Sequence, residues 1–104
     1  QKDGFTPAYI AAQKGQTAAL EVLVKAPGCD VNQAENNGET PAHIAAQEGQ
    51  LVALGLLVRA GCDVNHADNN GWTPALVAAQ EGQTAALEIL VDAGCDVNQA
   101  TKDG

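Results

Sequence analysis

The chain repeats itself with a period of 33 or 34 residues, and this period limits its fold more than any other feature. The pattern Gly-x-Thr-Pro-Ala starts at Gly4, Gly38 and Gly71, which stand 34 and 33 residues apart. A period of about 20–50 residues indicates a solenoid, in which each unit packs only on its neighbours. We divide the single domain 1–104 into units at about 1–34, 35–67 and 68–100, and 101–104 begins a fourth unit.

Each unit carries signals for two short helices. Thr-Pro at 6–7, 40–41 and 73–74 is typical of an N-cap followed by a proline in the first helical turn. Gly15, Gly49 and Gly82 then end this first helix after about two turns. We expect a second helix over about 17–25, 51–59 and 84–92. Helices this short are marginal alone, so the units must stack into an all-α solenoid.

Turn signals join one unit to the next. Asn-Gly at 37–38 and 70–71 predicts β-hairpin-type turns. The segment Gly-Cys-Asp-Val-Asn, which precedes each such turn, should be extended. Asp30, Asp63 and Asp96 recur in identical context, which indicates a turn or cap role rather than chemistry.

Composition and charge exclude several classes of function. Thirteen acidic and five basic residues give a net charge of −8, which argues against nucleic acid and anionic membranes as partners. The apolar runs are far too short to span a bilayer. The chain has no serine and no glycine-rich phosphate loop. We therefore expect no enzyme activity, no catalytic residues and no cofactor.

The cysteines are expected to be structural. Cys29, Cys62 and Cys95 stand 33 residues apart, so consecutive thiols lie about one helix layer apart, roughly 8–10 Å. A disulfide needs Cα atoms within about 7 Å. The chain lacks Cys-x-x-Cys and has two histidines, so we predict no metal site and three small, buried thiols. Free thiols favour a reducing, intracellular compartment, and we expect the cytoplasm.

These units resemble the ankyrin repeat over essentially the whole chain. The family pattern Gly-x-Thr-Pro-Leu-His-x-Ala-Ala, then Gly, Leu-x-x-Leu-Leu and Gly-Ala-Asp-Val-Asn is followed in all three. The resemblance implies antiparallel helix pairs and a concave groove lined by hairpin turns and first helices. It also implies that His43 hydrogen-bonds near the threonine hydroxyl and ties layers together. Alanine at Ala8, Ala42 and Ala75 departs from the pattern and should lower stability, as should Gly55 within a helix.

By resemblance, the positions that differ between units line the groove and contact a partner. After each turn glycine stand Phe5, Glu39 and Trp72, and this row is asymmetric. The alternative is that the aromatic rings only cover their own turns. The full expected groove comprises Lys2, Asp3, Phe5, Gln13, Lys14, Asn36, Asn37, Glu39, Gln47, Glu48, Asn69, Asn70, Trp72, Gln80 and Glu81.

Function follows from this groove. We expect a non-enzymatic protein–protein interaction module that binds a partner protein or basic peptide. We interpret the chain as a fragment of a longer ankyrin array. The alternatives to the binding role are a structural spacer within such an array or a designed consensus-like scaffold. The first and third units are nearly identical and keep apolar outer faces, so we also expect end-to-end self-association. Resemblance to repeats modified by an animal asparaginyl hydroxylase marks Asn65 and Asn98, although asparagines that hydrogen-bond the backbone are the simpler interpretation.

Overall fold

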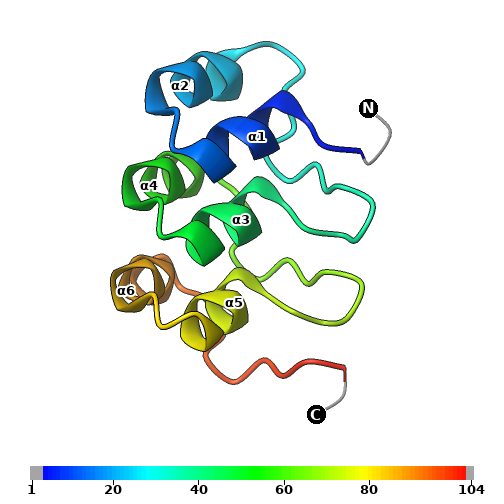
Figure 1. Cartoon of the computed structure of the whole chain (residues 1–104), viewed down its shortest axis with the longest axis vertical. Helices are drawn as coiled ribbons and strands as arrows, with labels where there is room; N and C mark the ends of the chain where they lie inside the picture. The colour runs from blue at the N-terminus through cyan, green and yellow to red at the C-terminus, as the bar shows by residue number, and fades with distance from the viewer. Residues whose placement is uncertain (1–3, 103–104) are drawn as a thin grey trace.

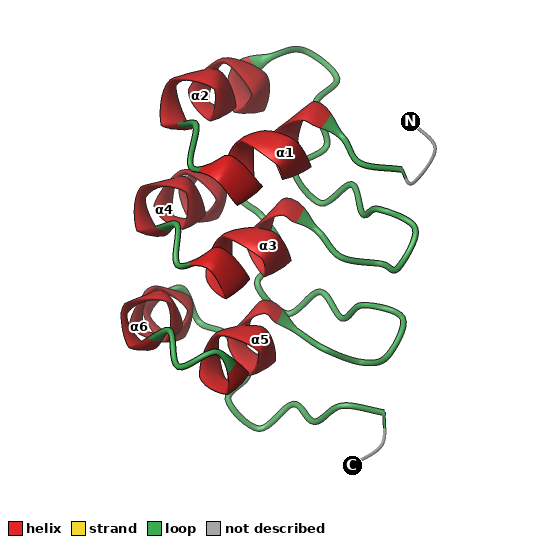
Figure 2. Cartoon of the chain, in the orientation of Figure 1, coloured by secondary structure: helices red, strands yellow, loops and turns green. Residues whose placement is uncertain are grey.

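The computed structural model describes residues 4–102 and contains six helices in that range. They form three antiparallel pairs, one pair in each unit, and no strand occurs among the residues described (Figures 1 and 2). This confirms the all-α repeat. The helices are α1 (Pro7–Lys14), α2 (Thr17–Lys25), α3 (Pro41–Glu48), α4 (Leu51–Arg59), α5 (Pro74–Gln80) and α6 (Thr84–Asp92).

The first helix of each unit begins and ends where the sequence predicts. The Thr6, Thr40 and Thr73 side chains each accept a hydrogen bond from the backbone N–H three residues later, which satisfies one of the free donors at the helix start. Gly15 and Gly49 follow α1 and α3 with φ of 69°, a left-handed conformation that glycine adopts at low cost.

The second helices depend on packing rather than on caps. The residues that precede α2, α4 and α6 make no side-chain capping hydrogen bond. Instead, Leu20, Leu54, Leu57 and Leu90 are completely buried between layers. Burying a leucine contributes about 1.5–3 kcal/mol, so each of these helices is held by the unit beside it.

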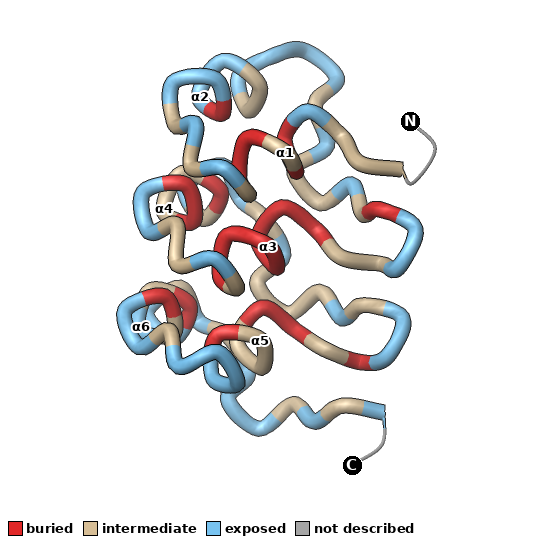
Figure 3. Tube along the Cα trace, viewed as in Figure 1, coloured by how far each residue is buried: buried red, intermediate tan, exposed pale blue. Residues whose placement is uncertain are grey.

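The helices form two columns, with α1, α3 and α5 in one and α2, α4 and α6 in the other (Figure 1). The loops that join the units project from the α1–α3–α5 column, and we call residues 33–40 and 66–73 the fingers. The buried residues concentrate on α3 and on the facing sides of its neighbours (Figure 3). The middle unit is therefore the most enclosed, because it alone has a neighbour on each side.

The segment before each finger is a turn, so the expectation of an extended link is wrong. The Asp30 carboxylate accepts a hydrogen bond from the Asn32 N–H at 2.9 Å, and the Gln33 N–H donates to the Asp30 carbonyl at 3.0 Å. The same arrangement recurs at Asp63 and Asp96. Aspartate competes for nearby backbone donors in this way, and the expected turn role of these residues is confirmed.

Candidate interaction surface

Each finger is built around a carboxylate that sequence reasoning missed. In the first, the Glu35 N–H donates to the Glu39 carbonyl at 2.9 Å and closes the turn. The buried Glu35 side chain accepts hydrogen bonds from the N–H groups of Asn37 and Glu39, at 2.7 and 2.9 Å. Asp68 holds the second finger by the same contacts. An acid three residues before the turn glycine, in Glu/Asp-Asn-Asn-Gly, was the available signal.

The asparagines at the finger tips connect one finger to the next. The Asn69 N–H donates to the Asn37 carbonyl at 2.9 Å, and the Asn69 side-chain amide donates to the Asn36 carbonyl at 3.1 Å. The Lys102 N–H donates to the Asn70 carbonyl at 3.1 Å. These four asparagines are exposed, as expected, but the amide of Asn69 is engaged within the molecule.

In the first and second units, the side chain five residues after the turn glycine reaches the finger that follows. In the first unit this is Tyr9, whose hydroxyl donates to the Glu39 carboxylate at 3.2 Å. The Phe5 ring stacks on the Tyr9 ring with centroids 5.0 Å apart. Phe5 therefore covers its own unit, in agreement with the simpler interpretation of that residue, yet it remains half-exposed to solvent.

In the second unit the same position holds His43, which is buried. The Thr40 N–H donates to His43 Nδ1 at 3.0 Å, and His43 Nε2 lies 2.7 Å from the Trp72 carbonyl. A backbone N–H only donates and a carbonyl only accepts, so the neutral ring carries its proton on Nε2. Burial lowers the pKa of His43. The implied role of this histidine, tying two layers together beside the threonine hydroxyl, is confirmed.

His66 takes part in this packing, although no sequence signal points to a role for it. Its ring meets the His43 ring edge-on, with centroids 6.2 Å apart. His66 is half-buried, and its N–H donates to the Asp63 carbonyl at 3.3 Å in the turn that folds it toward the stack.

The finger side carries carboxylates that no lysine or arginine among the residues described neutralises. Among residues 4–102, no carboxylate forms an ion pair with a lysine or arginine side chain. Burial raises the pKa of Glu39, and Glu35 and Asp68 raise it further, whereas the hydrogen bond from Tyr9 opposes the shift. Burial and the nearby Glu39 carboxylate raise the pKa of Tyr9, so its hydroxyl keeps its proton and donates.

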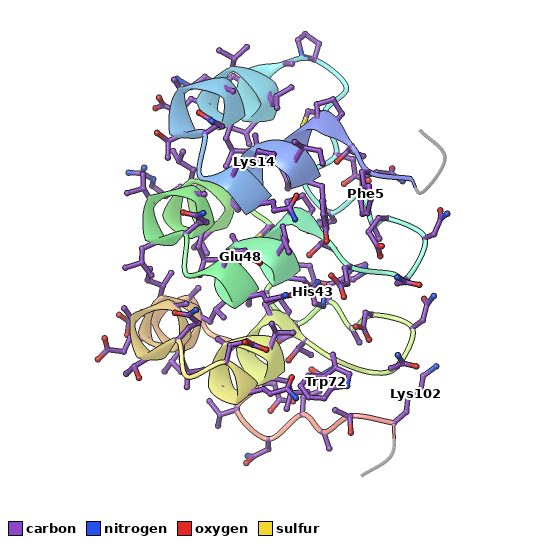
Figure 4. All side chains as sticks on the ribbon, in the orientation of Figure 1. Phe5, Lys14, His43, Glu48, Trp72 and Lys102 are labelled. Carbon is purple, nitrogen blue, oxygen red and sulfur yellow. The ribbon has the colours of Figure 1, made fainter. Side chains whose placement is uncertain are left out.

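The ends of the first helices carry exposed polar side chains, and these ends lie away from the fingers (Figure 1). Lys14 and Glu48 project from equivalent ends of α1 and α3, while Phe5 and Trp72 lie on the finger side at different levels (Figure 4). The remaining expected residues divide by exposure: Gln80 and Glu81 are exposed, and Gln13 and Gln47 are half-buried. Lys2 and Asp3 lie outside the described residues.

Other predicted sites have structural surroundings. The three cysteines are free and half-buried, rather than fully buried as expected. Burial raises the pKa of the Cys62 thiol to about 11. The Asn65 side-chain oxygen accepts a hydrogen bond from the Asp96 N–H at 2.7 Å, whereas Asn98 is exposed, and hydroxylation of either stays a prediction. No group of His, Cys, Asp and Glu within residues 4–102 could hold a metal ion.

Comparison with known proteins identifies a family whose repeats cover nearly the whole stack. A family model described as ankyrin repeats, in three copies, matches residues 9–101. A search of curated proteins gave no match to the chain. In the part of the chain that the structure describes, no helix has the length and apolar character needed to cross a membrane.

Proposed function

The chain belongs to the ankyrin repeat family, and from this premise we propose that its finger side binds a basic segment of a partner protein. Ankyrin repeats are in general protein–protein interaction modules and are typically not enzymes. Our proposal adds the surface and the chemistry of the ligand to this general role. It also takes the chain to be a non-enzymatic protein of the cytoplasm, supported by three thiols that form no disulfide.

One observation carries the proposal. Phe5, Glu39 and Trp72 occupy the same position in successive units, so two aromatic rings flank a carboxylate along one side of the stack. Within residues 4–102, none of the carboxylates forms an ion pair with a lysine or arginine side chain. A cationic side chain would gain both a carboxylate and an aromatic face there.

The distribution of charge suggests the orientation of the ligand. Glu39, Glu48 and Glu81 lie in the second and third units, whereas the cation Lys14 lies in the first. The most basic part of the bound segment should therefore face the second and third units. Trp72 provides apolar area there and a ring face for an arginine or lysine.

Trp72 also makes the test direct, because it is the only tryptophan. Peptides would be selected on the chain from a displayed random library, and their binding followed by Trp72 fluorescence. We expect selected peptides to be basic and added salt to slow their association. The Trp72→Ala variant, followed by calorimetry, should bind about 30-fold more weakly, which corresponds to about 2 kcal/mol.

Two double variants separate the finger side from the outer helices. Glu48→Lys with Glu81→Lys changes charge at the ends of α3 and α5, in the column of first helices that carries the fingers, and should lower the association rate. Glu21→Lys with Glu88→Lys makes the same change in charge at exposed positions of α2 and α6. Peptides whose affinity responds equally to both pairs, or to neither pair nor Trp72→Ala, would contradict the proposal.

The spacer role is the second candidate, and the similarity between units favours it. The first and third units differ at few positions, as expected where units serve mainly to continue a stack. A spacer would give no selected peptide with salt-dependent affinity for the finger side.

A further inference from the structure

The middle unit differs from its neighbours on the outer side of the stack, which α2, α4 and α6 form behind the first helices (Figure 1). At two outer positions the first and third units have the same residues, alanine and, three residues later, glutamate. In α4 the same positions hold Val52 and Gly55. The equivalent residues are Ala18 and Glu21 in α2, and Ala85 and Glu88 in α6. The outer side of the middle unit is therefore apolar where the other two units carry charge.

Neither stacking nor helix formation accounts for Val52 and Gly55. Because α4 lies between α2 and α6, a further unit at either end of the stack would not cover it (Figure 3). Val52 is nonetheless 64 % exposed, and Leu51 before it is 40 % exposed. A Cβ at Gly55 would meet no atom of the neighbouring helices within 4 Å, so no close packing requires glycine there. Valine and glycine are also poorer helix formers than alanine and glutamate, and residues that weaken an element without serving its packing indicate a functional surface.

A groove borders α4 on each flank of this surface. The groove toward α6 has a volume of about 520 Å³, and its lining includes Val52, Gly55, Val58 and Ile89. The groove toward α2 has a volume of about 400 Å³, and its lining includes Leu56. Both grooves lie between units, and Arg59 lines both of them. The surface therefore offers apolar hollows on either side of α4 and one cation at the end of that helix.

The charges around these grooves set the charge of a ligand. Arg59 is the only charged side chain of α4, and Lys25 lines the groove toward α2. Among residues 4–102, neither of them forms an ion pair with a carboxylate. Glu21 and Asp92 also line the grooves, but they belong to the flanking helices α2 and α6. A ligand that lies along α4 therefore meets one charge on that helix, a cation, and a carboxylate would pair with it.

We propose that the outer side of α4 binds an amphipathic helix of a partner protein, with apolar side chains on Val52, Gly55 and Val58 and a carboxylate on Arg59. The three apolar residues stand three positions apart on one side of α4, and a ligand helix with apolar residues at similar spacing fits such a surface. Gly55 permits a close approach, because the distance between packed helices depends on the side chains at the contact. This ligand is apolar and acidic, in contrast to the basic segment proposed for the finger side, so the two surfaces would take different partners.

Selection from a displayed library of helical peptides tests this surface. Each peptide carries an apolar stripe at helical spacing, and its flanking positions vary between glutamate and lysine. We expect selection on the chain to enrich a class of peptides with glutamate beside the stripe, whose binding is then measured by fluorescence anisotropy of the labelled peptide. Trp72→Ala is the control for the finger side and should leave the affinity of this class unchanged.

Two variants test whether the peptides bind on α4. Val52→Ala with Gly55→Glu gives α4 the residues of the other units and places a carboxylate under the peptide. The selected peptides should bind this variant at least about tenfold more weakly, while the midpoint of its urea unfolding stays the same or rises. Arg59→Glu should weaken binding about tenfold, and peptides with lysine in place of the glutamate should regain the affinity. Gln80→Glu adds a negative charge at an exposed position of α5 and, as the matched control, should leave the affinity unchanged.

Three outcomes would overturn the inference. A lower unfolding midpoint for Val52→Ala with Gly55→Glu would mean that these two residues serve the fold. A selection without glutamate-bearing helices, or with helices that bind this variant as well as the parent chain, would mean that α4 is not the binding surface. Weakening by Trp72→Ala equal to that by the α4 variant would place these helices on the finger side. A failure of the finger side to bind basic peptides would leave all of these measurements unchanged.

Discussion

Replacing His43 tests whether hydrogen bonds, rather than the volume of the ring, tie the second unit to the third. The ring is 1 % exposed and satisfies two backbone groups, the Thr40 N–H and the Trp72 carbonyl. In His43→Leu, the apolar side chain fills the space but leaves both groups unpaired. Each unpaired buried group costs about 1–3 kcal/mol. We therefore expect a loss of about 2–4 kcal/mol in the free energy of unfolding.

His43→Gln is the matched variant. Threonine at the N-cap with glutamine three residues later forms a capping box, so the glutamine oxygen can accept the Thr40 N–H in place of the ring. Only the bond to the Trp72 carbonyl is then lost, and we expect a cost of about 1 kcal/mol. Urea unfolding followed by circular dichroism measures both values. Equal losses in the two variants would refute the reasoning, because the ring would then act only by filling space.

The pH dependence gives a second readout for the same residue. Burial lowers the pKa of His43 in the folded chain, so the unfolded chain binds a proton more readily as pH falls below about 6.5. The stability that the neutral ring provides is complete above that pH and is lost below it. The slope is limited to about 1.4 kcal/mol per pH unit for one proton. His43→Gln should remove this slope, because it replaces the one residue to which the slope is assigned; identical slopes in the two proteins would contradict this assignment.

Three further perturbations follow from the packing. Leu57→Ala should cost about 2–5 kcal/mol in urea unfolding and Leu23→Ala clearly less, because Leu57 is completely buried and Leu23 only half-buried; the reverse order would contradict the stacking argument. Gly55→Ala should raise stability by about 0.5–1 kcal/mol, since a Cβ at Gly55 meets no atom within 4 Å; a loss would mean that this space is needed. Cys62 should react with thiol reagents at pH 8 more slowly than an unfolded thiol, because its pKa is raised to about 11; equal rates would contradict its burial.

The helices could be predicted from the sequence because their signals are local. Threonine before proline fixes a helix start through one side-chain hydrogen bond, and a glycine two turns later fixes its end. Both signals act within a few residues. The repeat then supplied the stacking, because neighbouring units with the same sequence offer one another the same surfaces.

Burial and finger geometry could not be predicted in the same way. Leu23 and Leu57 occupy equivalent positions, yet one is half-buried and the other completely buried, because burial depends on the neighbouring unit. Glu35 belongs to a residue type that is mostly solvated, and only the finger geometry shows that backbone N–H groups enclose it. His66 likewise meets the ring of His43 only after the turn before it forms.

The side chain five residues after each turn glycine differs in all three units, and this explains why the two interfaces between units differ. Tyr9, His43 and Leu76 occupy equivalent positions, and Tyr9 and His43 each reach the finger that follows. Tyr9 reaches a side chain, the Glu39 carboxylate, whereas His43 reaches a backbone carbonyl that every residue type would provide. The interface between the first and second units therefore depends on which residue follows the turn glycine, whereas the interface between the second and third units does not. Replacing Glu39 would therefore weaken the interface between the first and second units. Glu39 also stands at the centre of the proposed binding surface. A partner cation at Glu39 would act on folding and recognition together, because it would neutralise a carboxylate whose pKa burial already raises.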